Sequence, residues 1–185
     1  AVGSAAVDAC TTGNHVVGIG YQALSALTTA QFCIGIGKDA GLSVTTGIRN
    51  TLVGGLAGDA ITTAGYNIAL GYQSLSSNTI GNSNVAIGTN AMFANVAADR
   101  NVAVGTDALE NMTAASTADT YNTAIGYHAG KQVTSGTLNT LVGGEAGDAI
   151  TSGNYNTAFG YDALSAEDAG SANTAIGALT LAQQD

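Results

Sequence analysis

The sequence of 185 residues contains no proline and no tryptophan, only three phenylalanines, and few charged side chains. Charged residues make up 9% of the chain, against roughly a quarter in typical globular domains. Four Lys and Arg against thirteen Asp and Glu give a net charge of −9, which argues against nucleic-acid binding because that role needs a basic surface. No apolar run reaches the roughly 18 residues of a membrane-spanning helix, so we expect no membrane insertion. The 45% apolar content excludes intrinsic disorder.

Glycine, in contrast, is abundant, and eleven of the 26 glycines mark a repeat. Successive marked glycines follow a 17-residue spacing, except for one 21-residue interval between Gly105 and Gly126. The last eight units also carry Asn four positions before the glycine. These repeat positions are Asn50, Asn67, Asn84, Asn101, Asn122, Asn139, Asn156 and Asn173, with Gly54, Gly71, Gly88, Gly105, Gly126, Gly143, Gly160 and Gly177. A repeat in this phase defines the organisation of the whole chain.

Each unit contains two short apolar segments, one from the Asn to the Gly and one from an Ala three positions later to a Thr eight positions after the Gly. Segments of this length with glycine-rich boundaries predict strands rather than helices. A 17-residue unit cannot bury its apolar face alone, so it must stack on copies of itself. The sequence therefore predicts an all-β, parallel β-solenoid of about eleven coils that forms a single domain over residues 1–185. The 21-residue interval predicts a longer turn over residues 113–121.

The first strand of each unit is apolar on both faces. We expect the column of large side chains that contains Ile125 to fill the coil. The columns of small side chains that contain Ala124 and Ala129 would then face outward. An uncharged outer face of this kind predicts burial against another copy of the chain.

Several columns invite a functional interpretation. The Asn column predicts a ladder of amides, each bonding the next coil. The Thr column is compatible with ice binding, although adjacent pairs such as Thr62 and Thr63 would point to opposite faces. Residues 54–62 and 143–151 partly match a calcium-binding nonapeptide, but the match is not tandem, so we expect Asp59 and Asp148 to be solvated.

Four consecutive coils place Asp107, His128, Glu145 and Asp162 in one column, beside a second column with Glu110, Lys131 and Asp148. Such side chains could bind a transition metal, or act as the paired carboxylates of a polysaccharide-degrading enzyme. We favour solvated turns, and expect no catalytic residue, no metal and no cofactor. Cys10 and Cys33 fall in different columns, which predicts free thiols. Tyr21, Tyr72, Tyr127 and Tyr161 share the turn position after the glycine. Together with Tyr66 and Tyr155 they are candidate glycan contacts, although packing in turns would explain them equally well.

The phrase Asn-Thr-Ala-Ile-Gly-Tyr at residues 122–127, repeated in phase, resembles the head repeats of YadA-like trimeric autotransporter adhesins and, more closely, repeats in bacteriophage tail fibres. The 17-residue unit is longer than the repeat of the adhesin heads, and Thr mostly replaces the Ser that follows their Asn. The resemblance implies a left-handed β-roll in a parallel homotrimer. It also implies a structural and adhesive role on a virion tail fibre, outside the cell, with a cell-surface glycan or protein as receptor. A bacterial surface adhesin is the alternative. We expect the chain to be a fragment of a longer fibre and not an enzyme.

Overall fold

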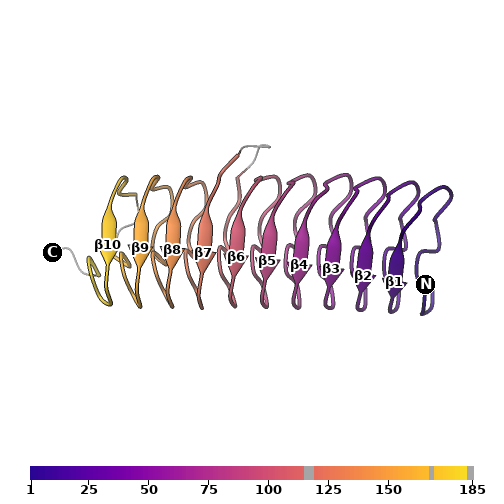
Figure 1. Cartoon of the computed structure of the whole chain (residues 1–185), viewed down its shortest axis with the longest axis horizontal. Helices are drawn as coiled ribbons and strands as arrows, with labels where there is room; N and C mark the ends of the chain where they lie inside the picture. The colour runs from indigo at the N-terminus through magenta and orange to yellow at the C-terminus, as the bar shows by residue number, and fades with distance from the viewer. Residues whose placement is uncertain (115–118, 167–168, 183–185) are drawn as a thin grey trace.

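A computed structural model describes residues 1–114, 119–166 and 169–182. Ten parallel strands of three residues each lie side by side in chain order and form one face of a rod (Figure 1). The strands are β1 (Val17–Ile19), β2 (Ile34–Ile36), β3 (Thr51–Val53), β4 (Ile68–Leu70), β5 (Val85–Ile87), β6 (Val102–Val104), β7 (Thr123–Ile125), β8 (Thr140–Val142), β9 (Thr157–Phe159) and β10 (Thr174–Ile176). The predicted parallel β-solenoid of 17-residue coils is confirmed.

The register of the strands follows the repeat. Val17 in β1 pairs with Ile34 in β2, one unit later, and the pattern continues to β10. Across the 21-residue interval, Val102 still pairs with Thr123, so the strands remain in register. Part of the predicted longer turn, residues 115–118, lies outside the described residues. The first predicted coil, at Gly3, contributes only an isolated bridge between Val2 and Ile19.

The second strand predicted in each unit does not form in the described part of the chain, where this segment is a series of turns. The reason is a left-handed backbone at the second and fourth positions after the glycine, such as Gln73 (φ 55°) and Leu75 (φ 51°). Alternating signs of φ cannot produce an extended strand. The turns nevertheless bond to the next coil, as the Leu75 N–H does to the Ala91 carbonyl at 3.0 Å.

The inside and the outside of the coil are the reverse of our expectation. Ala124, the central residue of β7, is fully buried, whereas Ile125 is 41% exposed. Ala129 is also fully buried, so neither small-residue column faces outward. The interior is narrow, and the turns supply its large side chains, which leaves room only for small residues at most strand centres. These buried turn residues include Leu24, Leu27, Val44, Ile61, Leu75, Met92, Leu109, Met112, Ile150 and Leu164.

A ladder of buried Asn side chains runs along the start of the strands. The Asn50 side-chain oxygen accepts from the backbone N–H of Asn67 at 3.0 Å, and its Nδ2 donates to the Ala64 carbonyl at 2.8 Å. The same pair of bonds recurs from Asn67 onward, with a change of partners at the long turn. Cys33 takes the Asn position in β2's coil, and its Sγ donates to the Gly47 carbonyl at 3.3 Å. Each Asn therefore satisfies backbone groups of two neighbouring segments.

The repeat glycine follows directly after each strand, where the backbones of two coils lie close together. Gly105 has φ of 137°, and a Cβ atom there would lie 2.2 Å from the Gly126 carbonyl oxygen. Both the backbone conformation and the close approach exclude any larger residue. The glycine column thus permits the close approach of neighbouring coils.

Candidate functional site

The solvent-facing side of the sheet is an apolar surface, here called the strand face. In each strand the first and third side chains point outward, while the central residue is buried, as in β4 with its exposed, buried, exposed alternation. The third position is occupied by Ile19, Ile36, Val53, Leu70, Ile87, Val104, Ile125, Val142, Phe159 and Ile176. The first position is Val or Ile in most of the N-terminal strands and mostly Thr in the C-terminal ones. Ten strands about 4.8 Å apart make this face roughly 43 Å long.

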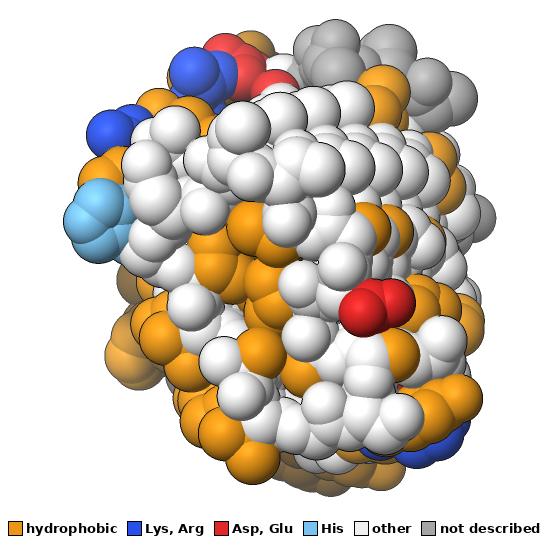
Figure 2. All heavy atoms as spheres, turned by 90° about the vertical axis from the view of Figure 1, so that its right-hand side faces the viewer, with side chains coloured by type: hydrophobic (Ala, Val, Ile, Leu, Met, Phe, Trp, Pro, Cys, Tyr) orange, Lys and Arg blue, Asp and Glu red, His pale blue; other side chains and the backbone are white. Residues whose placement is uncertain are grey.

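The strand face carries no charged side chain. Viewed along the rod from its N-terminal end, charged side chains are sparse, and hydrophobic ones lie both in the middle of the end surface and along its lower rim (Figure 2). Parallel sheets are normally covered on both faces. In a single chain, side chains of the strand face such as Leu70 and Ile125 are therefore open to solvent.

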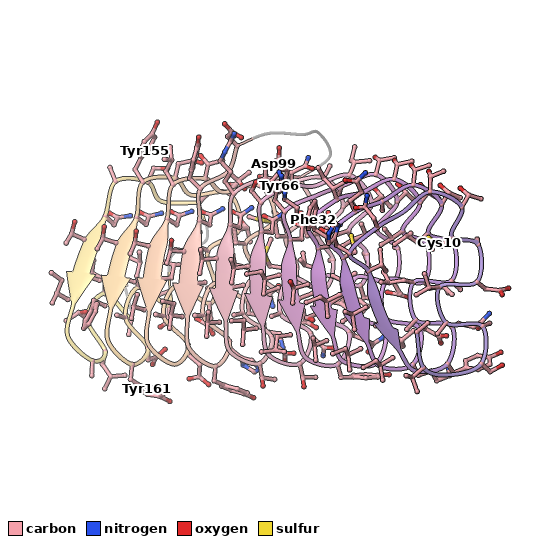
Figure 3. All side chains as sticks on the ribbon, turned by 45° about the vertical axis from the view of Figure 1, so that its right-hand side comes forward. Cys10, Phe32, Tyr66, Asp99, Tyr155 and Tyr161 are labelled. Carbon is pink, nitrogen blue, oxygen red and sulfur yellow. The ribbon has the colours of Figure 1, made fainter. Side chains whose placement is uncertain are left out.

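A second exposed feature is the column five positions before each repeat glycine, where the structure places several aromatic and cationic side chains on one turn edge. Phe32, Tyr66 and Tyr155 lie along this edge, and Tyr161 lies on the opposite edge (Figure 3). The column contains His15, Phe32, Arg49, Tyr66, Ser83, Arg100, Tyr121, Leu138, Tyr155 and Ala172. From this column we selected only Tyr66 and Tyr155 on the basis of the sequence, although their shared phase with Phe32 and Arg49 was visible in it.

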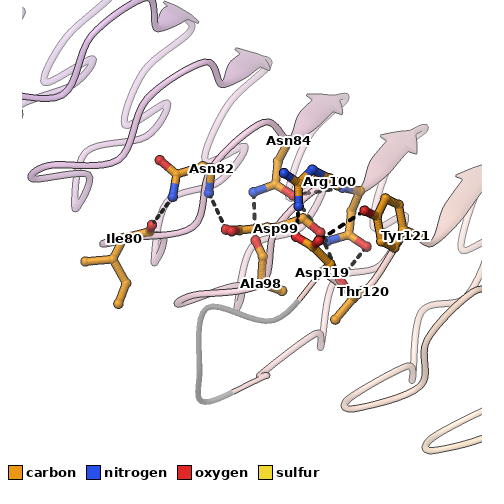
Figure 4. Close-up of polar contacts among 10 residues, drawn as sticks. Ile80, Asn82, Asn84, Ala98, Asp99, Arg100, Asp119, Thr120 and Tyr121 are labelled. Carbon is orange, nitrogen blue, oxygen red and sulfur yellow. Dashed lines mark hydrogen bonds and ion pairs between the residues drawn. The ribbon is translucent and has the colours of Figure 1, made fainter.

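Tyr66 and Tyr155 are 50% and 65% exposed, but they are not brought together. Five coils separate them, which corresponds to about 24 Å along the rod. Tyr66 is accompanied by Arg49, whose Nη1 donates to the Tyr66 hydroxyl at 2.6 Å. Tyr121 lies between Tyr66 and Tyr155 in this column. Its hydroxyl donates a hydrogen bond to Asp119, which also forms an ion pair with Arg100 (Figure 4).

The acidic columns on the opposite turn edge form an ion-pair network. Lys131 Nζ lies 3.2 Å from both Asp107 Oδ2 and Glu110 Oε2, and His128 Nε2 lies 3.1 Å from the same Asp107 oxygen. Partial burial alone would raise the pKa of Asp107, but the hydrogen bonds from Asn90 and Lys131 and the Lys131 charge outweigh it and hold that pKa below its usual value. These side chains are half-buried, not freely solvated as we expected. Lys131 supplies the positive charge for this cluster.

Further along the same edge, Asp148 is partly buried, and its Oδ1 has no hydrogen-bond partner in the structure. Burial, together with the charges of Asp162 and Glu145, raises the pKa of Asp148. Asp59, the other residue of the calcium-like phrase, accepts a hydrogen bond from the Ser76 hydroxyl at 2.7 Å. Over residues 1–114, 119–166 and 169–182, no three His, Cys, Asp or Glu side chains are placed to hold a metal ion.

The Thr column is occupied by contacts within the rod. The Thr28 hydroxyl donates to the Thr45 carbonyl at 3.1 Å, and Thr45 does the same to Thr62. An ice-binding surface presents its hydroxyls to water, so these bonds do not favour that interpretation. Both thiols are free, with Cys33 buried and Cys10 half-buried, and burial raises the pKa of Cys33.

Comparisons of the chain with protein families, with curated proteins and with solved structures found no match. None of the described residues belongs to a helix long and apolar enough to cross a membrane. Two surfaces of the chain itself, the strand face and the aromatic and cationic column, are available for contacts with other molecules.

Proposed function

We propose that this chain is a structural and adhesive segment of a fibre, of the kind found in bacteriophage tail fibres. Three copies would lie in parallel, each a left-handed β-roll, outside the cell and attached to a virion. The observation that carries the proposal is the strand face, a long uncharged surface with exposed side chains such as Ile19, Leu70 and Ile125. An apolar surface of this length exceeds what a soluble monomer usually exposes.

The occupant of the strand face is another copy of the same chain. Because the face is a uniform ladder, a parallel copy presents the same side chains at the same spacing along the whole rod. Closed cyclic symmetry would bury every copy's face without leaving one open for filament growth. The number three rests on the resemblance to trimeric head repeats, and the need for a partner rests on the exposed side chains.

The assembly is tested by the mass of the purified protein in solution. Light scattering at micromolar concentration should give three times the chain mass of 18.1 kDa. A stable monomer would overturn the assembly and, with it, the fibre.

The adhesive role is tested with labelled protein on whole cells. Binding to bacterial cells supports a phage fibre, in which three copies add avidity at the receptor. Binding confined to animal cells or matrix supports the alternative, a bacterial surface adhesin. The proposal assigns no catalysis to the chain, and release of reducing ends from a bound polysaccharide would overturn that part.

A further inference from the structure

Four consecutive coils place an aromatic or cationic side chain at the same position, five residues before the repeat glycine, on the turn edge that carries Tyr66. We call this set, His15, Phe32, Arg49 and Tyr66, the aromatic–cation row. All four residues have a left-handed backbone, with φ between 55° and 63°. Neighbouring members are one coil apart, or about 4.8 Å along the rod. The row is therefore linear and parallel to the axis of the rod.

The members of the row contact one another in sequence. The rings of His15 and Phe32 are stacked, with centroids 4.6 Å apart and an angle of 8° between planes. The Arg49 guanidinium carbon lies 5.8 Å from the Phe32 centroid and 5.2 Å from the Tyr66 centroid. Arg49 is thus held between two rings by cation–π contacts and by its bond to the Tyr66 hydroxyl. Phe32 and Tyr66 remain about half exposed.

Arg49 differs from the other three Lys and Arg side chains in its charge environment. Lys38 pairs with Asp39, Arg100 with Asp119, and Lys131 with Asp107 and Glu110. Among the described residues, Arg49 has no carboxylate partner within ion-pair distance. The turn segments that carry the row, residues 11–16, 28–33, 45–50 and 62–67, contain no Asp or Glu. In a chain of net charge −9, this edge holds an oriented and uncompensated positive charge.

We propose that the aromatic–cation row binds a linear acidic polysaccharide. A carboxylate of the polysaccharide pairs with the Arg49 guanidinium, and the apolar faces of adjacent pyranose rings contact the exposed parts of Phe32 and Tyr66. Arginine suits this role because its planar fork binds a carboxylate bidentately and is already fixed in orientation. The inference rests on the proposed adhesive function and names the chemical class of its receptor.

Single-stranded nucleic acid also stacks on aromatic side chains, but the charges do not favour it. A nucleic acid carries a phosphate at every nucleotide and requires a basic groove along the strand. The row offers one unpaired cation over four coils, on a protein with a large excess of acidic residues. A polysaccharide with one carboxylate for several ring contacts matches this composition better.

The test uses calorimetric titration of the assembled protein with a hyaluronan oligosaccharide, in which only every second sugar carries a carboxylate, and with the same oligosaccharide after reduction of its carboxyl groups. The parent should bind the acidic form with a Kd below about 1 mM. Arg49→Ala should weaken that binding about tenfold, as expected for loss of a charged hydrogen bond, and Tyr66→Ala should weaken both forms. Arg100→Ala is the matched control. It removes the same charge from the same column, but from a side chain already paired with Asp119.

The proposal is overturned if the parent does not bind, if Arg49→Ala binds as the parent does, or if the acidic and reduced forms bind equally. Preferential binding of a single-stranded oligonucleotide would also overturn it. Mass and melting temperature are measured for each variant, since a change of mass in Arg49→Ala would make the row a subunit contact instead. Loss of glycan binding with an intact trimer leaves the fibre proposal standing, whereas glycan binding by a monomer would overturn the fibre alone.

Discussion

The Leu141 side chain, at the centre of β8, fills the space next to Gly147. A Cβ atom added to Gly147 would lie only 2.7 Å from Leu141 Cδ2. One coil later the arrangement is reversed, because β9 has Ala158 at its centre and the turn supplies Leu164. Gly147 and Leu164 have the same backbone φ of 59°. These two coils therefore fill the interior in different ways, one with a large residue in the strand and the other with a large residue in the turn.

This difference predicts a compensating pair of substitutions. Leu141→Ala should destabilise the protein by about 2–5 kcal/mol through the cavity it leaves, and Gly147→Leu by about 1–3 kcal/mol through overpacking. The double variant reproduces the arrangement of the next coil. Its loss of unfolding free energy should be smaller than the sum of the two single losses by at least about 1 kcal/mol. Denaturant unfolding of all four proteins measures this coupling, and strictly additive effects would contradict it.

The reversed faces of the strand predict that two adjacent residues respond differently to the same change. Ala124→Asp places an unpaired charge in the coil and should abolish the β-sheet signal in circular dichroism. Ile125→Asp places its charge on the strand face, so the signal should persist while the mass falls to that of one chain. Equal loss of structure in both variants would show that both positions are part of the interior.

The Asn ladder predicts a large cost for a side chain that makes no contact with solvent. Asn84 accepts from the N–H of Asn101 at 3.0 Å and donates to the Ala98 carbonyl at 2.8 Å. Asn84→Ala leaves the Asn101 N–H buried without a partner, while the Ala98 carbonyl keeps only its longer bond from Asn95 Nδ2 at 3.3 Å. The loss should cost about 1–3 kcal/mol.

Asn111→Ala is the matched control for this ladder. It removes an exposed bond to Gln132 and should change the free energy of unfolding by less than about 0.5 kcal/mol. Similar losses in the two Asn variants, in thermal or denaturant unfolding, would refute a structural role for the ladder.

The repeat made the solenoid and its register predictable, because strands that recur in phase with a 17-residue unit can only stack. It did not determine which face was inside. Alternation in a three-residue strand says that Ala124 and Ile125 face opposite ways, but the interior volume is set by turn residues such as Leu109. The left-handed turns were also hidden, since residues such as Leu75 give no sequence signal for positive φ. For the same reason the sequence did not show that Phe32, Arg49 and Tyr66 would contact one another.

Two carboxylates on the acidic edge should respond to pH in opposite directions. The Asp107 pKa is lowered from 3.8, so its interactions stabilise the fold above that pH and are lost as the pH falls through the lowered value. Asp107→Asn should therefore melt below the parent at pH 7. The difference should shrink as the pH falls below 3.8.

The contribution of Asp148 to stability changes with pH in the opposite direction, because its pKa is raised from 3.8 by burial and by the charges of Asp162 and Glu145. The folded state favours the protonated carboxyl, so its contribution to stability is present below pH 3.8 and is lost as the pH rises through the raised value. At pH 7 the charged carboxylate is held partly buried, with its Oδ1 unpartnered in the structure. Asp148→Asn should then melt above the parent, and this advantage should decline on acidification. Melting curves of both variants from pH 3 to pH 7 check the pair, and parallel curves for the two substitutions would refute the assignment.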